Sequence, residues 1–268
     1  MPIFPNRSKW IHFFAVLFMV SSGSIFAQTS GGDIGRFLDR AAQKIAFYSD
    51  LKNWKASAVT TITKMDKTWK PESVTVVTKN VKVTNGEREE EILKAEETKK
   101  GKTTDVTLKY AQEAREEREK EKKRRAEEKD QNKRGEGRGQ SMTMTLDEML
   151  PFSEKKRAEF DFRLMENGVL DGRPVAVLDA AAKVKDEKNW EGRFLFDPAT
   201  HDLYQVEIKP SKNPKMVKEL EMRLTFEILD GRYLAVKSSR FKINGGIFIK
   251  HIRQLIEEEY SGYEVLDK

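Results

Sequence analysis

Few residues in this chain have the type and spacing of a catalytic or metal-binding group. The sequence has no cysteine and, beyond residue 27, only two histidines, His201 and His251. His201 follows an Asp-Pro sequence typical of a turn, so we expect a solvated turn residue, and His251 stands on a strand among isoleucines, so we expect a surface or hydrogen-bonded side chain. A zinc site needs several clustered ligands, and no ligand spacing is present. We therefore expect no metal and no cofactor.

Carboxylates and nucleophiles lead to the same expectation. The chain has no Gly-x-Ser-x-Gly sequence, no phosphate-binding glycine loop and no carboxylate pair set apart by its surroundings. Asp179 follows the apolar stretch 174–178 and, at a strand end, is expected to be exposed. A hydrolase, the enzymatic alternative, would have to depend on His201 or His251. We expect a protein that is not an enzyme.

The first 27 residues have the pattern of an export signal. Arg7 and Lys9 precede an apolar run from Trp10 to Val20, and small polar residues then lead to Ala27. A transmembrane anchor is the alternative, but this run is short for a hydrocarbon core of ~30 Å. A chain without cysteine forms no disulfide and cannot carry a lipid on an N-terminal cysteine. We expect cleavage near Ala27 and a periplasmic protein.

Charge is abundant but nearly balanced. The chain is 35% charged with a formal net charge of +6, which by itself indicates no nucleic-acid partner. Residues 111–140 hold 11 Lys or Arg and 9 Asp or Glu, with no apolar side chain larger than alanine. Such a segment cannot join a core. Oppositely charged pairs four residues apart predict a solvated helix to about residue 130, so this segment is expected to be a charged insertion.

The rest of the chain has the pattern of one helix followed by many strands. Residues 33–48 place apolar side chains on one helical face. From residue 55 the pattern changes to alternation, with turn signals at short intervals, and 220–228 is the cleanest strand. We predict a mainly β fold with α (α+β): an unclosed antiparallel β-barrel, a curved sheet of about nine to eleven strands covered by the N-terminal amphipathic helix. Residues 28–268 form one domain, interrupted by 111–140.

The stretch DPATHDLYQVEI, residues 197–208, carries a turn between two strands. Asp197, Pro198 and Thr200 shape that turn. Together with the first helix, the strand MRLTFEI and a last hairpin, this stretch resembles the LolA/LolB superfamily, the outer-membrane lipoprotein-sorting and periplasmic lipoprotein-carrier fold. The resemblance covers about residues 33–110 and 145–266, and the charged insertion has no counterpart in it. It implies an unclosed barrel whose hydrophobic hollow, covered by helices, holds acyl chains.

The amount of apolar surface supports a ligand as well. A lone helix cannot cover the apolar face of so many strands, and a large wet apolar face is unfavourable. The alternative is an ordinary packed core. The candidate lining residues come from the first helix and four strands; they are Phe37, Ile45, Phe160, Phe162, Phe194, Phe196, Leu224, Phe226, Ile247 and Ile249.

These patterns predict a periplasmic carrier or chaperone that binds acyl chains of lipid or lipoprotein non-covalently, with a role in outer-membrane lipoprotein sorting. The alternative function is a cell-envelope interaction scaffold on the same fold, with a protein partner. The basic loop within 207–223 is compatible with peripheral membrane contact. We expect a monomer and no nucleic-acid partner.

Overall fold

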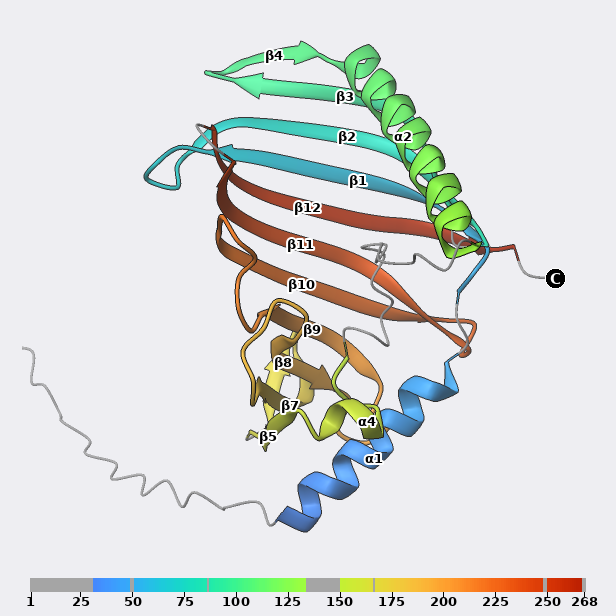
Figure 1. The fold of residues 1–268 in the computed structure, drawn as a ribbon, viewed down its shortest axis with the longest axis vertical. Helices are drawn as coiled ribbons and strands as arrows, with labels where there is room; N and C mark the ends of the chain where they lie inside the picture. The colour runs from blue at the N-terminus through green and yellow to red at the C-terminus, as the bar shows by residue number, and fades with distance from the viewer. Residues whose placement is uncertain are drawn as a thin grey trace, which may run out of the picture.

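The computed structural model describes residues 31–48, 51–85, 87–133, 150–165, 167–247 and 250–266. This part of the chain forms one open antiparallel sheet with helices beside it (Figure 1). In chain order the elements are α1 (Gly31–Phe47), β1 (Trp54–Met65), β2 (Pro71–Thr84), β3 (Glu87–Lys99), β4 (Lys102–Asp105), α2 (Thr107–Lys133), α4 (Glu154–Arg157), β5 (Phe160–Leu164), β6 (Gly168–Leu170), β7 (Arg173–Ala182), β8 (Trp190–Phe196), β9 (Leu203–Pro210), β10 (Val217–Leu229), β11 (Tyr233–Ile247) and β12 (Lys250–Val265).

Two meanders meet in the middle of the sheet. The strand order is β4-β3-β2-β1-β12-β11-β10-β9-β8-β7-β5, and β6 pairs with β7 beside β5. The chain thus builds one half outward from β1 to β4 and the other half inward from β5 to β12. The central β1–β12 pair, in which Ile62 lies opposite Ile256, joins the two halves. Its partners lie far apart in the sequence, so the two halves depend on each other for register.

The structure confirms a mainly β, unclosed antiparallel sheet but corrects the strand count to twelve in the described residues. Two strands are short, β4 with four residues and β6 with three. Runs of this length carry too little alternation to be separated from a neighbouring turn. The final run, 250–265, is a strand, but the expected turn at Asn244 and Gly245 is wrong: both residues lie in β11 and pair with Arg253 and Ile252 of β12.

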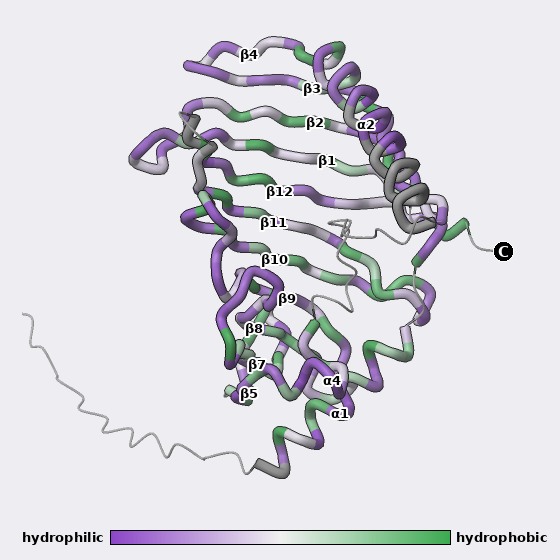
Figure 2. The backbone as a smooth tube through the Cα atoms, viewed as in Figure 1, coloured by the Kyte–Doolittle hydropathy of each residue, from purple (hydrophilic) through white to green (hydrophobic). Residues whose placement is uncertain are grey.

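Helix α1 packs on one end of the sheet through a narrow apolar stripe. Phe37, Leu38 and Ala41 are buried and join a core formed with strands β5 and β7–β10. The stripe follows the helical spacing of the sequence, and Figure 2 shows apolar and polar residues alternating along the helix. Residues 150–152, just before α4, complete this core with Leu150 and Phe152.

Helix α2 lies at the other end of the sheet, beside β3 (Figure 1). Its described residues are almost all hydrophilic (Figure 2), as the composition of the charged segment predicts. Thr107 fixes its first turn: the amide of Ala95 donates to Thr107 Oγ1 at 2.9 Å, and the Thr107 amide donates to Asp105 Oδ1 at 2.8 Å. The predicted export signal and residues 134–140 of the insertion lie outside the described residues.

Among the residues that the structure describes, no helix combines the length and the apolar composition needed to cross a membrane.

Candidate functional site

A hollow of about 1080 Å³ lies on the sheet face between the end of α1 and strands β1 and β10–β12. Small-molecule sites commonly have volumes of roughly 300–1,000 Å³, so this space has the size of a ligand site. Most of its lining residues are apolar or aromatic; they are Ile45, Ala46, Tyr48, Leu51, Trp54, Leu224, Phe226, Leu234, Ala235, Val236, Phe241, Ile256, Tyr260 and Tyr263. Thr60, Lys79, Arg88, Ser239 and Glu258 supply its polar groups.

Three aromatic rings form a continuous part of this wall. The ring of Trp54 lies 5.2 Å from that of Tyr263 and 6.0 Å from that of Tyr260, and the two tyrosine rings stack at 5.9 Å. The Tyr263 hydroxyl donates to the carbonyl of Val236 at 2.6 Å, and burial raises the pKa of Tyr263. Rings fixed by each other and by the backbone offer a rigid apolar surface at low entropic cost to a ligand.

Three of the ten candidate lining residues line the hollow: Ile45, Leu224 and Phe226. Five others belong to the packed end of the same face, where Phe37, Phe160, Phe194 and Phe196 are buried and Phe162 packs against them. Ile247 is the last residue of β11, and nothing is described of its side chain. Ile249 lies outside the described residues.

Phe152 explains why these phenylalanines do not face a hollow. Its ring contacts those of Phe194 at 4.9 Å and Phe196 at 5.5 Å, and Phe37 of α1 meets Phe196 edge-on at 5.4 Å. The protein's own side chains therefore fill the β5–β9 end of the face. The unfilled part lies nearer the middle of the sheet, where only the last turn of α1 borders it.

The turn at 197–202 holds α1 in place. Asp197 Oδ1 accepts the amides of Ala199 at 2.8 Å and Thr200 at 2.7 Å. These bonds, the Thr200 amide foremost, lower the pKa of Asp197 against a small burial cost. The Thr200 hydroxyl donates to Asp202 Oδ2 at 2.6 Å, and Asp202 Oδ1 accepts the Tyr48 hydroxyl at the end of α1. The turn residues of the sequence motif thus have a structural role.

Asp202 also forms an ion pair with a lysine of α1. Lys44 Nζ lies 3.1 Å from Asp202 Oδ1. Burial would raise the pKa of Asp202, but the bonds from Thr200, Tyr48 and Lys44 outweigh it and lower that pKa. Burial, together with the hydrogen bond to Asp202, raises the pKa of Tyr48.

His201 is buried in this turn rather than solvated, which corrects the expectation for it. Its ring centroid lies 5.0 Å from that of Phe37, and its backbone adopts a φ of 61°. The His201 side chain thus packs against the core. Nothing is described of the His251 side chain, Asp179 is half-buried, and among the described residues no three histidines or carboxylates are placed to hold a metal.

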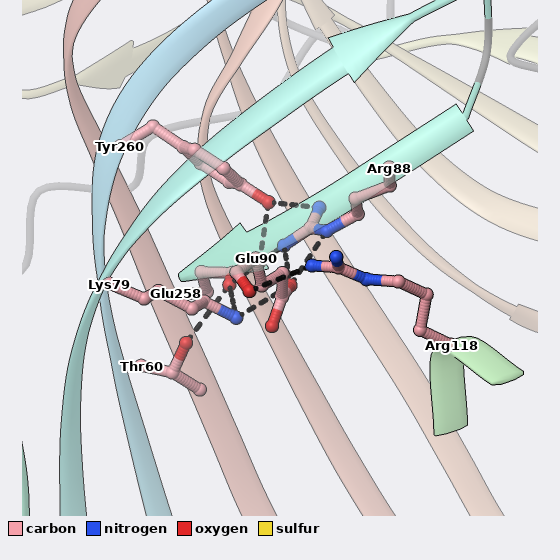
Figure 3. A network of polar contacts seen from close by, with 7 residues as sticks. All are labelled: Thr60, Lys79, Arg88, Glu90, Arg118, Glu258 and Tyr260. Atoms are coloured by element: carbon pink, nitrogen blue, oxygen red, sulfur yellow. Dashed lines mark hydrogen bonds and ion pairs between the residues drawn. The ribbon is translucent and has the colours of Figure 1, made fainter. Parts of the chain in front are cut away.

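Ionised side chains gather at the polar end of the hollow; we name Lys79, Arg88, Glu90 and Glu258 the ion cluster (Figure 3). Lys79 Nζ lies 2.7 Å from Glu258 and 2.9 Å from Glu90. Arg88 donates from Nε to Glu90 at 2.7 Å and from Nη2 to Glu258 at 3.1 Å. The Lys79 side chain is only 9% exposed and that of Glu258 13%. Buried charges persist only when paired in this way.

Hydroxyl groups complete the ion cluster. Thr60 donates to Glu258 at 2.9 Å, Tyr260 donates to Glu258 at 2.5 Å, and Arg88 Nη1 donates to the Tyr260 oxygen at 2.7 Å. Burial alone would raise the pKa of Glu258, but Arg88 and Lys79 outweigh it and lower the pKa to about 2. Burial likewise opposes the charge of Arg88, while Tyr260, Glu258 and Glu90 raise its pKa. Both groups are therefore ionised at neutral pH.

The ion cluster separates the hollow from a second space of about 440 Å³ beneath α2. Arg118 of α2 reaches the cluster from that side and donates to the carbonyl of Glu90 at 3.1 Å (Figure 3). Sequence reasoning did not identify this cluster. The available signal was Lys79, which shares the buried face of its strand with Val77 and Val81. A lysine at an inward strand position needs a buried partner.

No protein-family model and no curated protein sequence matches the chain. Solved structures similar to it include a LolA superfamily protein from Nitrosomonas europaea, with 10% identity over 87% of this chain and 94% of that chain and a TM-score of 0.35. A DUF1329 family protein from Desulfovibrio piger has 12% identity over 87% and 93%, with a TM-score of 0.36. The Pseudomonas aeruginosa MucA/MucB complex has 9% identity over 88% and 100%, with a TM-score of 0.25. These similar structures include a member of the LolA superfamily, which the sequence also resembles.

Proposed function

We propose that this protein is a non-enzymatic, periplasmic carrier of acyl chains from lipid or lipoprotein, which it binds reversibly in the hollow. The observation that carries the proposal is the hollow itself, an apolar-walled space of about 1080 Å³ on the sheet face. Helix α1 borders it through Ile45 at one end and the ion cluster closes the other. In this proposal α1 acts as a partial cover, and the export signal brings the chain to the periplasm.

Acyl-chain binding is driven by the removal of the apolar surface of the hollow from water. Burial of apolar surface contributes roughly 25 cal/mol per Å². Leu234, Phe241 and Ile256 present such surface between the two ends, and their neighbours there are mainly apolar. A flexible chain of methylene groups adapts to an elongated wall of this kind and needs no directional bonds. Binding and release then require no covalent chemistry.

The test fills the hollow from within. Ala235 is buried on β11 and lines the hollow, so Ala235→Phe places a ring in the space. Ala181→Phe on β7 adds the same ring at an exposed position. Titration with a fluorescent fatty acyl ester is expected to show about one site in the unsubstituted protein and in Ala181→Phe, and roughly tenfold weaker binding in Ala235→Phe. Equal affinity in all three proteins, or no binding at all, would contradict the proposal.

A second candidate function, a scaffold for an envelope protein, is favoured by α2. Beyond the half-buried Tyr110, Ala111 and Ala114, the described part of this helix has little apolar surface to bury, yet Arg118 and Thr107 hold it against the sheet. A helix that exposes charges of both signs is suited to a polar partner surface. Replacing the outward charges Lys120, Glu119 and Lys123 by glutamine separates the two functions. A scaffold loses its partner in pull-downs, whereas an acyl carrier keeps full uptake of the acyl ester.

A further inference from the structure

We infer that the ion cluster makes the hollow selective for acyl ligands with an uncharged polar group, an ester, amide or hydroxyl, over ligands ending in a carboxylate or phosphate. This inference rests on the proposed function and adds the chemical class of the ligand. It follows from the placement of polar groups in the hollow and from their pairing.

The polar groups of the hollow gather at one end. Thr60, Lys79, Arg88 and Glu258 come from four strands, β1, β2, β3 and β12, and line the space together. The α1 end is lined by Ile45, Ala46 and Leu51 and by Tyr48, whose hydroxyl is engaged by Asp202. A ligand with one apolar body and one polar group matches this wall only with its polar group at the ion cluster.

The charges at that end already cancel. Each cation, Lys79 and Arg88, contacts both carboxylates, Glu90 and Glu258, at 3.1 Å or less. Among the described residues that line the hollow, the charged ones are Lys79, Arg88 and Glu258, with Glu90 directly behind them. Neither α1 nor β10 nor β11 adds a charge to the lining.

An entering anion would lose its hydration without gaining an unneutralised cation. It would also approach the ionised carboxylate of Glu258 across a short distance. Burying an ion without a counter-charge costs several kcal/mol, more than burying a neutral polar group that finds a hydrogen bond. A carbonyl or hydroxyl finds donors here, because a guanidinium and an ammonium have N–H groups beyond those that two carboxylates engage. The hydroxyl of Ser239 lies on the same wall.

The experiment compares palmitate with monopalmitoylglycerol, which share one acyl chain, by displacement of the fluorescent acyl ester at mildly alkaline pH. We expect the unsubstituted protein to bind monopalmitoylglycerol at least about tenfold more tightly than palmitate. Glu258→Gln removes one negative charge from the hollow and is expected to erase or reverse this ratio. Glu257→Gln is the matched control. Glu257 is the neighbour of Glu258 on β12, but its side chain lies on the opposite face, where it pairs with Arg240 at 3.4 Å. The ratio is therefore expected to stay unchanged in this variant.

Lys79→Gln gives an independent second variant, which leaves the cluster with excess negative charge and is expected to widen the ratio. If Glu258→Gln does not fold, the affinity ratio measured for Lys79→Gln tests the inference in its place. Equal or tighter binding of palmitate by the unsubstituted protein, or a ratio that Glu257→Gln shifts as much as Glu258→Gln does, overturns the inference and leaves acyl binding intact. If no acyl compound binds, the proposed function fails and this inference fails with it.

Discussion

Glu258 connects the chemistry of the hollow to the stability of the sheet. It lies on β12, accepts bonds from Thr60, Lys79, Arg88 and Tyr260, and thereby ties the central strand to β1, β2 and β3. Figure 3 shows these partners directed toward Glu258, and Thr60, Lys79 and Arg88 line both the hollow and the space beneath α2. A single residue thus closes the polar end of the hollow and holds the strands that form it.

The first prediction concerns the pH dependence that Glu258 confers. Its pKa falls from 4.5 to about 2 on folding, so its contribution to stability is complete above pH 4.5 and is lost as the pH falls toward 2. We expect the free energy of unfolding to drop more steeply over this range in the unsubstituted protein than in Glu258→Gln. Urea denaturation at a series of pH values measures the difference, and parallel curves for the two proteins would contradict the assignment.

The second prediction concerns Gly192 on β8. Its φ is 148°, and a Cβ at this position would lie 2.1 Å from the carbonyl oxygen of Glu207 on the paired strand β9. We expect Gly192→Ala to lower the free energy of unfolding by about 3 kcal/mol or more, because backbone must move. Gly231→Ala is the control: its φ is 64° but no atom lies within 4 Å, so only the strain of about 1 kcal/mol applies. Equal losses in the two variants would contradict the close approach.

The sequence predicts the structural role of some single side chains well and that of others poorly. Asp197, Pro198 and Thr200 are recognisable as a turn because the preference is local. The lining of the hollow is not local: Phe194 and Leu224 both occupy inward positions of alternating strands, yet only Leu224 borders the hollow. What separates them is Phe152, which arrives from a distant segment and fills one end.

Helix α1 depends on a small number of polar contacts at its end. The third prediction is that Asp202→Ala, which removes the acceptor for Tyr48 and Lys44, lowers the free energy of unfolding by about 2 kcal/mol. Hydrogen exchange is expected to rise at the last turn of α1 while the sheet stays protected. Asp161→Ala, an exposed carboxylate with a 3.9 Å ion pair, should cost less than 0.5 kcal/mol. Unchanged exchange in α1 would show that the turn does not hold it.

The fourth prediction concerns how α2 is held. Arg118 donates to the Glu90 carbonyl and lies 3.7 Å from Glu89, while the apolar contribution of the described helix is small and comes from the half-buried Tyr110, Ala111 and Ala114. Arg118→Ala is expected to increase hydrogen exchange across α2, with a change of about 1 kcal/mol or less in global stability. Lys120→Ala changes an exposed charge on the same helix and should leave exchange as it was. Protection that survives Arg118→Ala would mean that other contacts hold α2.

The sequence predicts which segments are helices and strands more fully than it predicts how these elements pair and pack. The helix at 31–47, the charged helix and the long strands follow from period and charge, both of which are properties of short windows. The β1–β12 pairing and the position of α2 over the ion cluster depend on contacts between segments far apart in the chain. No local signal encodes these contacts, and the three- and four-residue strands are too short to have a period.

Across the whole molecule, one sheet face has two ends with opposite properties. At the β5–β9 end, α1 and Phe152 fill the face with apolar side chains. Toward β1 and β12 the face is open, and the paired charges of the ion cluster end it. An open sheet with only one end filled keeps apolar surface that a ligand can bury, and this asymmetry is the basis of the proposed carrier function.

The most direct measurement is native mass spectrometry of the protein purified without detergent from its own cell envelope, with organic extraction of the same sample. The account predicts about one acyl-bearing molecule per chain, released by organic solvent, and its loss from Ala235→Phe but not from Ala181→Phe. A protein that is empty in this measurement and takes up no fluorescent acyl ester afterwards would contradict the central claim that the hollow holds an acyl chain.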